Sequence, residues 1–120
     1  MLSVVNLQNA ICIGRMAVFY IPSCKLDMDL PQGTPRQMLH EFFMQHYNAY
    51  THEASKIHGY WCKQDMLVFD ENERYEVSFD GEEKVHEFVA FLSRFCGLIG
   101  EDCIYLTMGE KSWLVMPEPK

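Results

Sequence analysis

The chain has 120 residues, the size of one domain, and its 48% hydrophobic and 22% charged residues are typical of a globular protein. Its formal net charge of −7 argues against a nucleic-acid partner, because binding to phosphates requires clustered Lys and Arg, and the ten basic residues here are scattered. No apolar run approaches the about 18 residues of a membrane-spanning helix, so we expect no membrane partner. The acidic excess favours solubility and suits a protein partner with a basic surface.

The cysteine pattern indicates a reducing compartment. The count of five is odd, and no Cys-x-x-Cys pair occurs. The first 15 residues also lack the basic start and continuous apolar core of a signal peptide. We therefore predict reduced thiols in a cytoplasmic protein. The five cysteines are Cys12, Cys24, Cys62, Cys96 and Cys103.

The first half of the chain predicts a strand and a helix after an ambiguous start. Residues 1–15 suit an edge strand or a loose arm, and Met16–Pro22 is a β-rich run that ends at proline. A polar loop over Ser23–Gly33 follows. Thr34 and Gln37 then form a Thr-x-x-Gln capping box with proline at the first helical position. The apolar spacing predicts a helix from there to about Tyr50.

The middle of the chain predicts two strands with a connection between them. Residues 54–62 form one strand, and residues 63–73 the connection, in which Met66–Phe69 can extend a strand or cover a sheet edge. Residues 74–80 alternate clearly, with Tyr75, Val77 and Phe79 on one face. Such period-two alternation is typical of a half-buried antiparallel strand.

The last third predicts a helix and two strands. Asp80-Gly81 leads into a helix over Glu82–Cys96, with Gly97 as its left-handed C-terminal residue. Strands are expected at Cys103–Met108 and Lys111–Met116, joined at Gly109-Glu110, and residues 117–120 form a tail.

The resulting order, β-α-β-β-α-β with one extra C-terminal strand, predicts a ferredoxin-like α+β sandwich over residues 16–116, with an antiparallel sheet and both helices on one face. Alternatively, Ser112–Met116 pairs with a dimer partner. Such a sheet leaves one face bare, and we place the ligand or interface surface there. Alternation puts Arg74, Glu76, Ser78 and Tyr105 on it. The strand at 54–62 adds either the set with His58, Tyr60 and Cys62 or the set with Ile57, Gly59 and Trp61; we assign His58 and Tyr60 and leave Trp61 open.

Metal, cofactor and catalytic motifs are not evident. Histidines recur every six residues from His40 to His58, but residues six apart on a helix lie about 240° apart around its axis. Zinc sites need closer spacings such as i, i+4. We therefore assign no metal site, no cofactor and no catalytic residue.

Four short segments together resemble a family. They lie in the order expected for small uncharacterised ferredoxin-like proteins of bacteria, phages and plasmids. The Gly-Gly-x-Thr usual in that family before the second strand is replaced by "NAYTHEAS". The resemblance implies the fold and no activity. The segments are Val18–Pro22, Gly59-Tyr60-Trp61, Arg74–Val77 and Glu101–Leu106.

Two functional hypotheses follow. The first is a non-enzymatic binding or interaction module, homodimeric through the open face or the C-terminal strand, and encoded by a mobile element as an inhibitor of a host protein. The second is a small monooxygenase- or isomerase-like enzyme with a pocket between sheet and helices. Its candidate residues are His58, Cys62 and Glu76.

Overall fold

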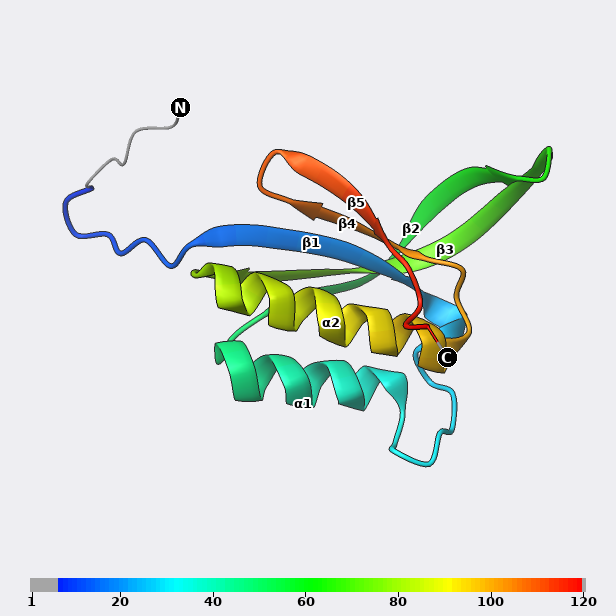
Figure 1. Cartoon of the computed structure of the whole chain (residues 1–120), viewed down its shortest axis with the longest axis horizontal. Helices are drawn as coiled ribbons and strands as arrows, with labels where there is room; N and C mark the ends of the chain where they lie inside the picture. The colour runs from blue at the N-terminus through cyan, green and yellow to red at the C-terminus, as the bar shows by residue number, and fades with distance from the viewer. Residues whose placement is uncertain (1–6, 120) are drawn as a thin grey trace.

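The computed structural model describes residues 7–119, which form one sheet covered on one face by two helices (Figure 1). The predicted α+β architecture is confirmed. Residues 1–6 of the predicted N-terminal arm or edge strand lie outside the described residues, and residues 7–14 are not part of the sheet. The elements in chain order are β1 (Arg15–Pro22), η1 (Ser23–Lys25), α1 (Pro35–Tyr47), β2 (Thr51–Lys63), β3 (Met66–Phe79), α2 (Glu82–Ile99), β4 (Ile104–Met108) and β5 (Lys111–Val115).

The strands lie in the order β2-β3-β1-β4-β5, and every neighbouring pair is antiparallel. The first four have the arrangement of a ferredoxin-like fold, with β1 and β3 in the centre, and β5 is the extra strand. It pairs with β4 within the chain, Leu114 lying opposite Tyr105. The alternative that this strand pairs only with a dimer partner is therefore wrong.

Helix α1 begins where the capping box predicts. The Thr34 hydroxyl accepts a hydrogen bond from the backbone N–H of Gln37, and the Gln37 side chain accepts one from the backbone N–H of Thr34. These bonds satisfy N–H groups that have no partner in the first helical turn. The helix ends before the predicted Tyr50, because Asn48 adopts the left-handed conformation with φ 66°.

Helix α2 runs beyond the predicted end at Cys96. Gly97 lies within the helix, and Gly100, with φ 72°, is the residue that ends it. The extension continues the buried stripe, because Ile99 is 1% exposed. The sequence thus predicted correctly that a left-handed glycine ends the helix, but placed it at Gly97 instead of Gly100.

The core lies between the sheet and the helices. Tyr75, Val77 and Phe79 all face it, as their alternation predicts. Phe43 from α1 and Phe88 from α2 pack against this layer. Ile104, Leu106 and Met108 of β4 face the same core and are buried as well.

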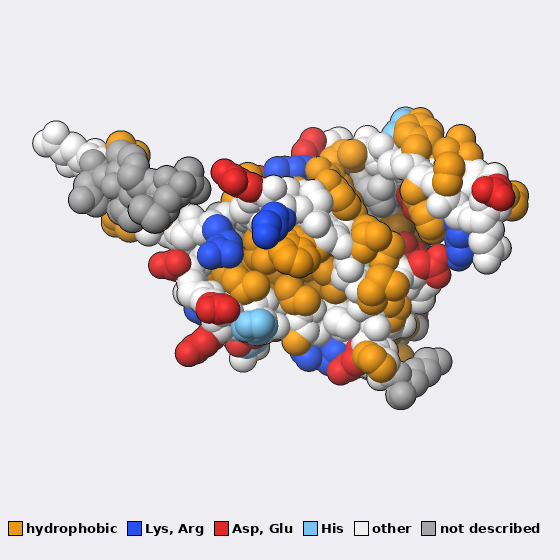
Figure 2. Space-filling view, turned by 45° about the horizontal axis from the view of Figure 1, so that its top comes forward, with side chains coloured by type: hydrophobic (Ala, Val, Ile, Leu, Met, Phe, Trp, Pro, Cys, Tyr) orange, Lys and Arg blue, Asp and Glu red, His pale blue; other side chains and the backbone are white. Residues whose placement is uncertain are grey.

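Of the predicted connection at residues 63–73, the alternative in which Met66–Phe69 extends a strand is confirmed, but the connection itself is far shorter than predicted. Gln64 and Asp65 alone form the turn, and both have positive φ values, 51° and 64°. Such a two-residue turn matches the twist of paired strands, so β3 starts at Met66 and pairs with β2 as far as Asn72, and again over Arg74–Glu76 after a shift of register. The distal part of this hairpin extends beyond the helices (Figure 1) and forms a separate lobe in the space-filling view (Figure 2).

Candidate functional site

The sheet face opposite the helices carries four of the six residues predicted for it. Arg74, Glu76 and Ser78 lie there, and Arg74 Nη2 forms an ion pair of 2.9 Å with Glu76 Oε1. Tyr105 of β4 lies on the same face and stacks on Tyr20 of β1, with ring centroids 6.2 Å apart. This surface is polar around two stacked tyrosines.

His58 and Tyr60 are not on that face, which corrects our assignment. Tyr60 pairs with Phe69 and His58 with Glu71. Because β3 runs without interruption, Phe69 and Glu71 share the helix-facing side with Tyr75. The β2 residues on the open side are therefore Ile57, Gly59 and Trp61, the alternative set of the sequence analysis.

Trp61 pairs with Val68, on the same side of the hairpin as Asp70, and its Nε1 donates to Asp70 Oδ2 over 3.2 Å.

The three residues suggested for an enzyme, His58, Cys62 and Glu76, do not lie together. Cys62 lies near the hairpin tip opposite Leu67, nine residues along β3 from Glu76 and so about 30 Å away.

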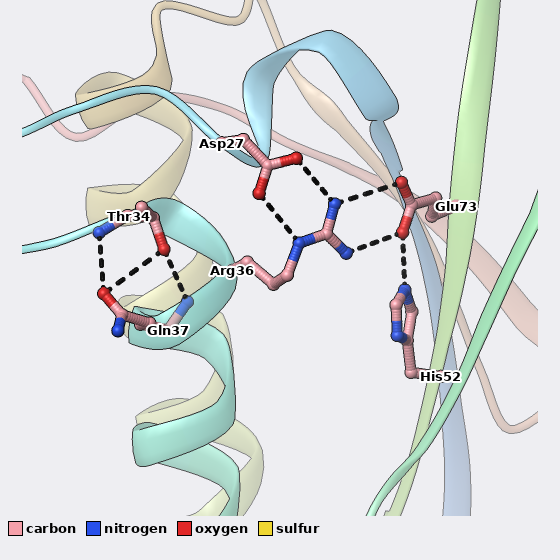
Figure 3. Close-up of polar contacts among 6 residues, drawn as sticks. All are labelled: Asp27, Thr34, Arg36, Gln37, His52 and Glu73. Atoms are coloured by element: carbon pink, nitrogen blue, oxygen red, sulfur yellow. Dashed lines mark hydrogen bonds and ion pairs between the residues drawn. The ribbon is translucent and has the colours of Figure 1, made fainter.

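A cluster of charged side chains that we did not predict lies between α1 and the sheet (Figure 3). Glu73 of β3 is 6% exposed and is the one buried charged residue among those described. Arg36, in the first turn of α1, donates from Nη1 to Glu73 Oε1 over 2.9 Å. His52 of β2 contacts the same oxygen through Nε2 at 2.6 Å. We call Asp27, Arg36, His52 and Glu73 the Glu73 cluster.

Asp27 fixes Arg36 from the other side. Its two carboxylate oxygens accept from Arg36 Nε and Nη2, each over 3.0 Å. A further bond of 3.4 Å from Nη2 to Glu73 means that four of the five guanidinium N–H groups are engaged. The Arg36 backbone N–H also donates to Leu26, over 2.9 Å. The guanidinium is therefore held in one place, with one N–H of Nη1 outside these bonds.

The cluster sets the protonation of its members. Burial raises the pKa of Glu73, but the hydrogen bonds from Arg36 and His52 outweigh burial and leave that pKa below its ordinary value. Glu73 is thus a carboxylate, which can only accept hydrogen bonds. His52 must then carry its proton on Nε2, and in the neutral ring Nδ1 is a free acceptor.

A cavity of about 370 Å³ adjoins the cluster, and we call it the Tyr75 pocket. The Tyr75 ring stacks on His52 at 4.4 Å and on Tyr50 at 6.2 Å. The Tyr75 hydroxyl is buried and has no hydrogen-bond partner, and burial raises its pKa. The pocket therefore combines stacked rings with an unpaired polar group. It is lined by Arg36, Gln37, His40, Glu41, Tyr50, His52 and Tyr75.

A second cavity, of about 540 Å³, lies at the other end of α1. It follows the edge of β3 beyond Glu76, where β2 no longer pairs with it. Two residues of the predicted face, Glu76 and Ser78, line it. No buried charged residue lies there, so the Tyr75 pocket is the more specific candidate site.

The sequence contains one signal for the Glu73 cluster. Counting back by two from Tyr75 places Glu73 in the inner, apolar row of β3, and a carboxylate in such a row needs partners. Arg36 and His52 could not be named as those partners, because neither lies within 20 residues of Glu73 in the sequence and only the fold brings them together.

Two absences are established for the described part of the chain. Residues 7–119 contain no group of three or more His, Cys, Asp and Glu side chains that could hold a metal ion. No helix in this range is long and apolar enough to cross a membrane. The predicted protein partner and oligomer stay predictions.

Comparison with known proteins reveals likeness in structure alone. No family model and no curated protein matches the sequence. Two solved structures share the fold, both described as phage SAM lyase. One, in complex with S-methyl-5'-thioadenosine, has a TM-score of 0.59 and 8% identity over 94% of this chain and 98% of its own. The other, in the apo state, has a TM-score of 0.59 and 11% identity over 96% and 99%. At these identities the likeness establishes a common fold.

Proposed function

We propose that this chain is a small-molecule-binding protein whose ligand is S-adenosylmethionine or a related methylthio nucleoside, bound in the Tyr75 pocket. The observation that carries the proposal is the buried Tyr75 hydroxyl, which lacks a partner next to a cavity walled by charged and aromatic groups. An unpaired buried hydroxyl is costly, and a ligand atom that pairs with it recovers that free energy. The cavity volume lies within the range of small-molecule sites.

The pocket has suitable groups for each part of such a ligand. The remaining Nη1–H of Arg36 suits the carboxylate of the amino-acid part. The ring of Tyr50 suits a sulfonium cation, because ring faces attract positive charge. Glu41 at the pocket wall adds a carboxylate, and the Tyr75 hydroxyl can pair with a ribose or purine atom.

The fold likeness supports this ligand class. The neighbours are described as SAM lyases, one of them with S-methyl-5'-thioadenosine bound, and each superposes on more than nine-tenths of this chain. A pocket between sheet and helices is also what the enzyme hypothesis expects. The Glu73–His52 pair, with a free ring nitrogen on His52, could accept a proton from a bound molecule. In such a cleavage His52 would take a proton from the carbon next to the one bonded to sulfur while the carbon–sulfur bond breaks, which releases S-methyl-5'-thioadenosine and an unsaturated four-carbon amino acid. We therefore include this reaction in the test.

The experiment is titration calorimetry of the purified chain with S-adenosylmethionine, S-methyl-5'-thioadenosine, adenosine and ATP. We expect the first two to bind and ATP to bind at least tenfold more weakly, since Glu41 and Glu73 repel phosphates. Tyr75→Phe should weaken binding about 5- to 100-fold, as expected when a ligand hydrogen bond is lost. Tyr20→Phe, on the opposite face and outside the pocket, is the matched control and should bind as the wild type does. Mass spectrometry of the incubated mixture measures cleavage.

Two results would contradict the proposal. One is the absence of heat for both sulfur nucleosides at millimolar concentration. The other is an equal loss of affinity in Tyr75→Phe and Tyr20→Phe. Binding of S-adenosylmethionine without formation of S-methyl-5'-thioadenosine would support the proposed ligand and exclude the lyase activity.

A second candidate function, an interaction module of a mobile element, is supported by a different observation. The distal hairpin exposes large apolar side chains that no part of residues 7–119 covers, among them Leu67 at 70% exposure. Large exposed apolar patches commonly mark protein interfaces. The phage origin of the structural neighbours is compatible with this version. A host protein with a basic surface would bind more weakly as salt is added, whereas an apolar contact would not.

A further inference from the structure

The hairpin of β2 and β3 consists of a supported part and an unsupported part. β1 pairs with β3 only over Asn72–Phe79. Among the described strands, residues 58–71 of the hairpin therefore pair only with each other, and in Figure 1 they extend beyond both helices. We call residues 58–71 the arm. A two-stranded ribbon is marginally stable by itself in water, so such an arm requires a surface to pack against.

The arm is apolar on both of its faces. On the helix-facing side, Tyr60 and Phe69 pack together with ring centroids 5.1 Å apart. Trp61 lies on the other side. Figure 2 shows hydrophobic side chains gathered on the lobe that the arm forms. The exposed fractions are Tyr60 63%, Trp61 39%, Met66 70%, Leu67 70% and Phe69 46%.

Most charges on the arm are already paired within the chain. Glu71 forms an ion pair of 3.2 Å with Lys56, and Lys63 forms one with Asp102, which lies just before β4. Asp70 accepts the hydrogen bond from Trp61. The arm therefore presents little free charge, and its partner does not need a basic surface. The net charge of −7 makes two copies repel each other, so a contact between copies has to use a surface that carries little free charge, as the arm does.

A second apolar surface lies at the opposite edge of the sheet. Leu114 of β5 is 62% exposed beside Tyr105 of β4, which is 47% exposed. Trp113 is 48% and Met116 59% exposed. β5 is the last strand of the sheet, so one side of its backbone ladder is open. We call these four residues the C-terminal edge.

We propose that the arm of one chain docks on the C-terminal edge of a second copy, and that the reciprocal contact closes a two-fold dimer. At about 200 Å² for a large apolar side chain, and counting both faces of each surface, the exposed fractions amount to roughly 600 Å² on the arm and 400 Å² on the edge. A stable interface needs about 800 Å² from each partner. Neither surface reaches that area alone, whereas the two together exceed it, and a two-fold contact uses both from each chain.

The test is the molar mass of the full chain by light scattering at 1 to 100 µM, with three variants that each add one carboxylate. Wild type should form a species of twice the 14.1 kDa chain mass. Leu67→Glu on the arm and Leu114→Glu on the edge should each raise the dimer dissociation constant at least tenfold. Met44→Glu, on the exposed face of α1, is the control and should remain dimeric. All three side chains lie outside the core, and circular dichroism checks that each variant is folded.

A wild type that is monomeric at 100 µM overturns the proposal. A dimer that Leu67→Glu leaves intact removes the arm from the interface. A dimer that is lost in Leu67→Glu but retained in Leu114→Glu means that the arm meets another surface, and this overturns the docking described here. If Met44→Glu weakened the dimer as much as the other two variants, the effect would come from the added charge, and the proposed docking would be wrong.

Discussion

His52 and Glu73, 21 residues apart in the chain, are joined by a hydrogen bond of 2.6 Å between Nε2 and Oε1. The bond connects the edge strand β2 to β3, and Arg36 links the same carboxylate to α1. One buried carboxylate thus holds three elements of the fold next to the Tyr75 pocket. Three predictions about stability follow from this cluster and from one close backbone contact.

The first prediction concerns the charge of Glu73. Glu73→Ala should lower the free energy of unfolding by about 2–3 kcal/mol, because Arg36 and His52 lose their shared acceptor while partly buried. Asp27→Asn is the matched control. The Asp27 side chain is 69% exposed, so its loss should cost less than about 1 kcal/mol. Urea denaturation measures both, and equal effects would contradict a structural role for Glu73.

The second prediction is a dependence of stability on pH. The folded pKa of Glu73 lies below its ordinary value of 4.5, so the carboxylate contributes its full stabilisation above that pH. The contribution is lost as pH falls through the folded pKa, when Glu73 must be protonated. The difference in unfolding free energy between wild type and Glu73→Gln should therefore shrink below pH 4.5. The raised pKa of Glu101 changes stability with pH in the opposite direction. Because Glu101 is present in both wild type and Glu73→Gln, its contribution cancels in the difference between them. A difference that stays constant from pH 7 to pH 3 would contradict the assignment.

The third prediction concerns Gly14, just before β1. A Cβ at this position would lie 2.1 Å from the backbone oxygen of Phe79, and φ is +110°. Gly81 has a similar φ of +99° but nothing within 4 Å of the added atom. Gly81→Ala should cost about 1 kcal/mol from backbone strain alone. Gly14→Ala should lower the thermal midpoint further, because Phe79 or the N-terminal segment must move. Similar midpoints in the two variants would show that the contact is unimportant.

Much of the fold could be predicted because its signals are local. The alternation around Tyr75, Val77 and Phe79 depends on nearest neighbours, and so does the capping box at Thr34. The predicted end of α2 was wrong because Gly97 and Gly100 lie three residues apart, and only the burial of Ile99 distinguishes them. Boundaries depend on tertiary contacts that a sequence pattern does not contain.

The assignment of β2 failed for a different reason. Between Glu53 and Ile57 the register shifts, and residues 54–56 lie opposite Glu73 alone. Alternation in β2 cannot be carried across such a bulge. The faces of His58 and Tyr60 are set by the uninterrupted strand β3 and by the two-residue turn at its start. The Glu73 cluster is beyond local reasoning as well, because its members meet only after the sheet and α1 have packed.

The length of β3 has a thermodynamic consequence. This one strand carries Phe69 on the arm and Tyr75 at the pocket, six residues or about 20 Å apart. Because no bulge interrupts β3 between these two residues, a binding event that reorients the strand at one of them also moves the other. By linkage, a ligand that changes the affinity of the arm for its partner must have its own affinity changed by the same factor. Occupancy of the pocket and assembly of the protein would then titrate together.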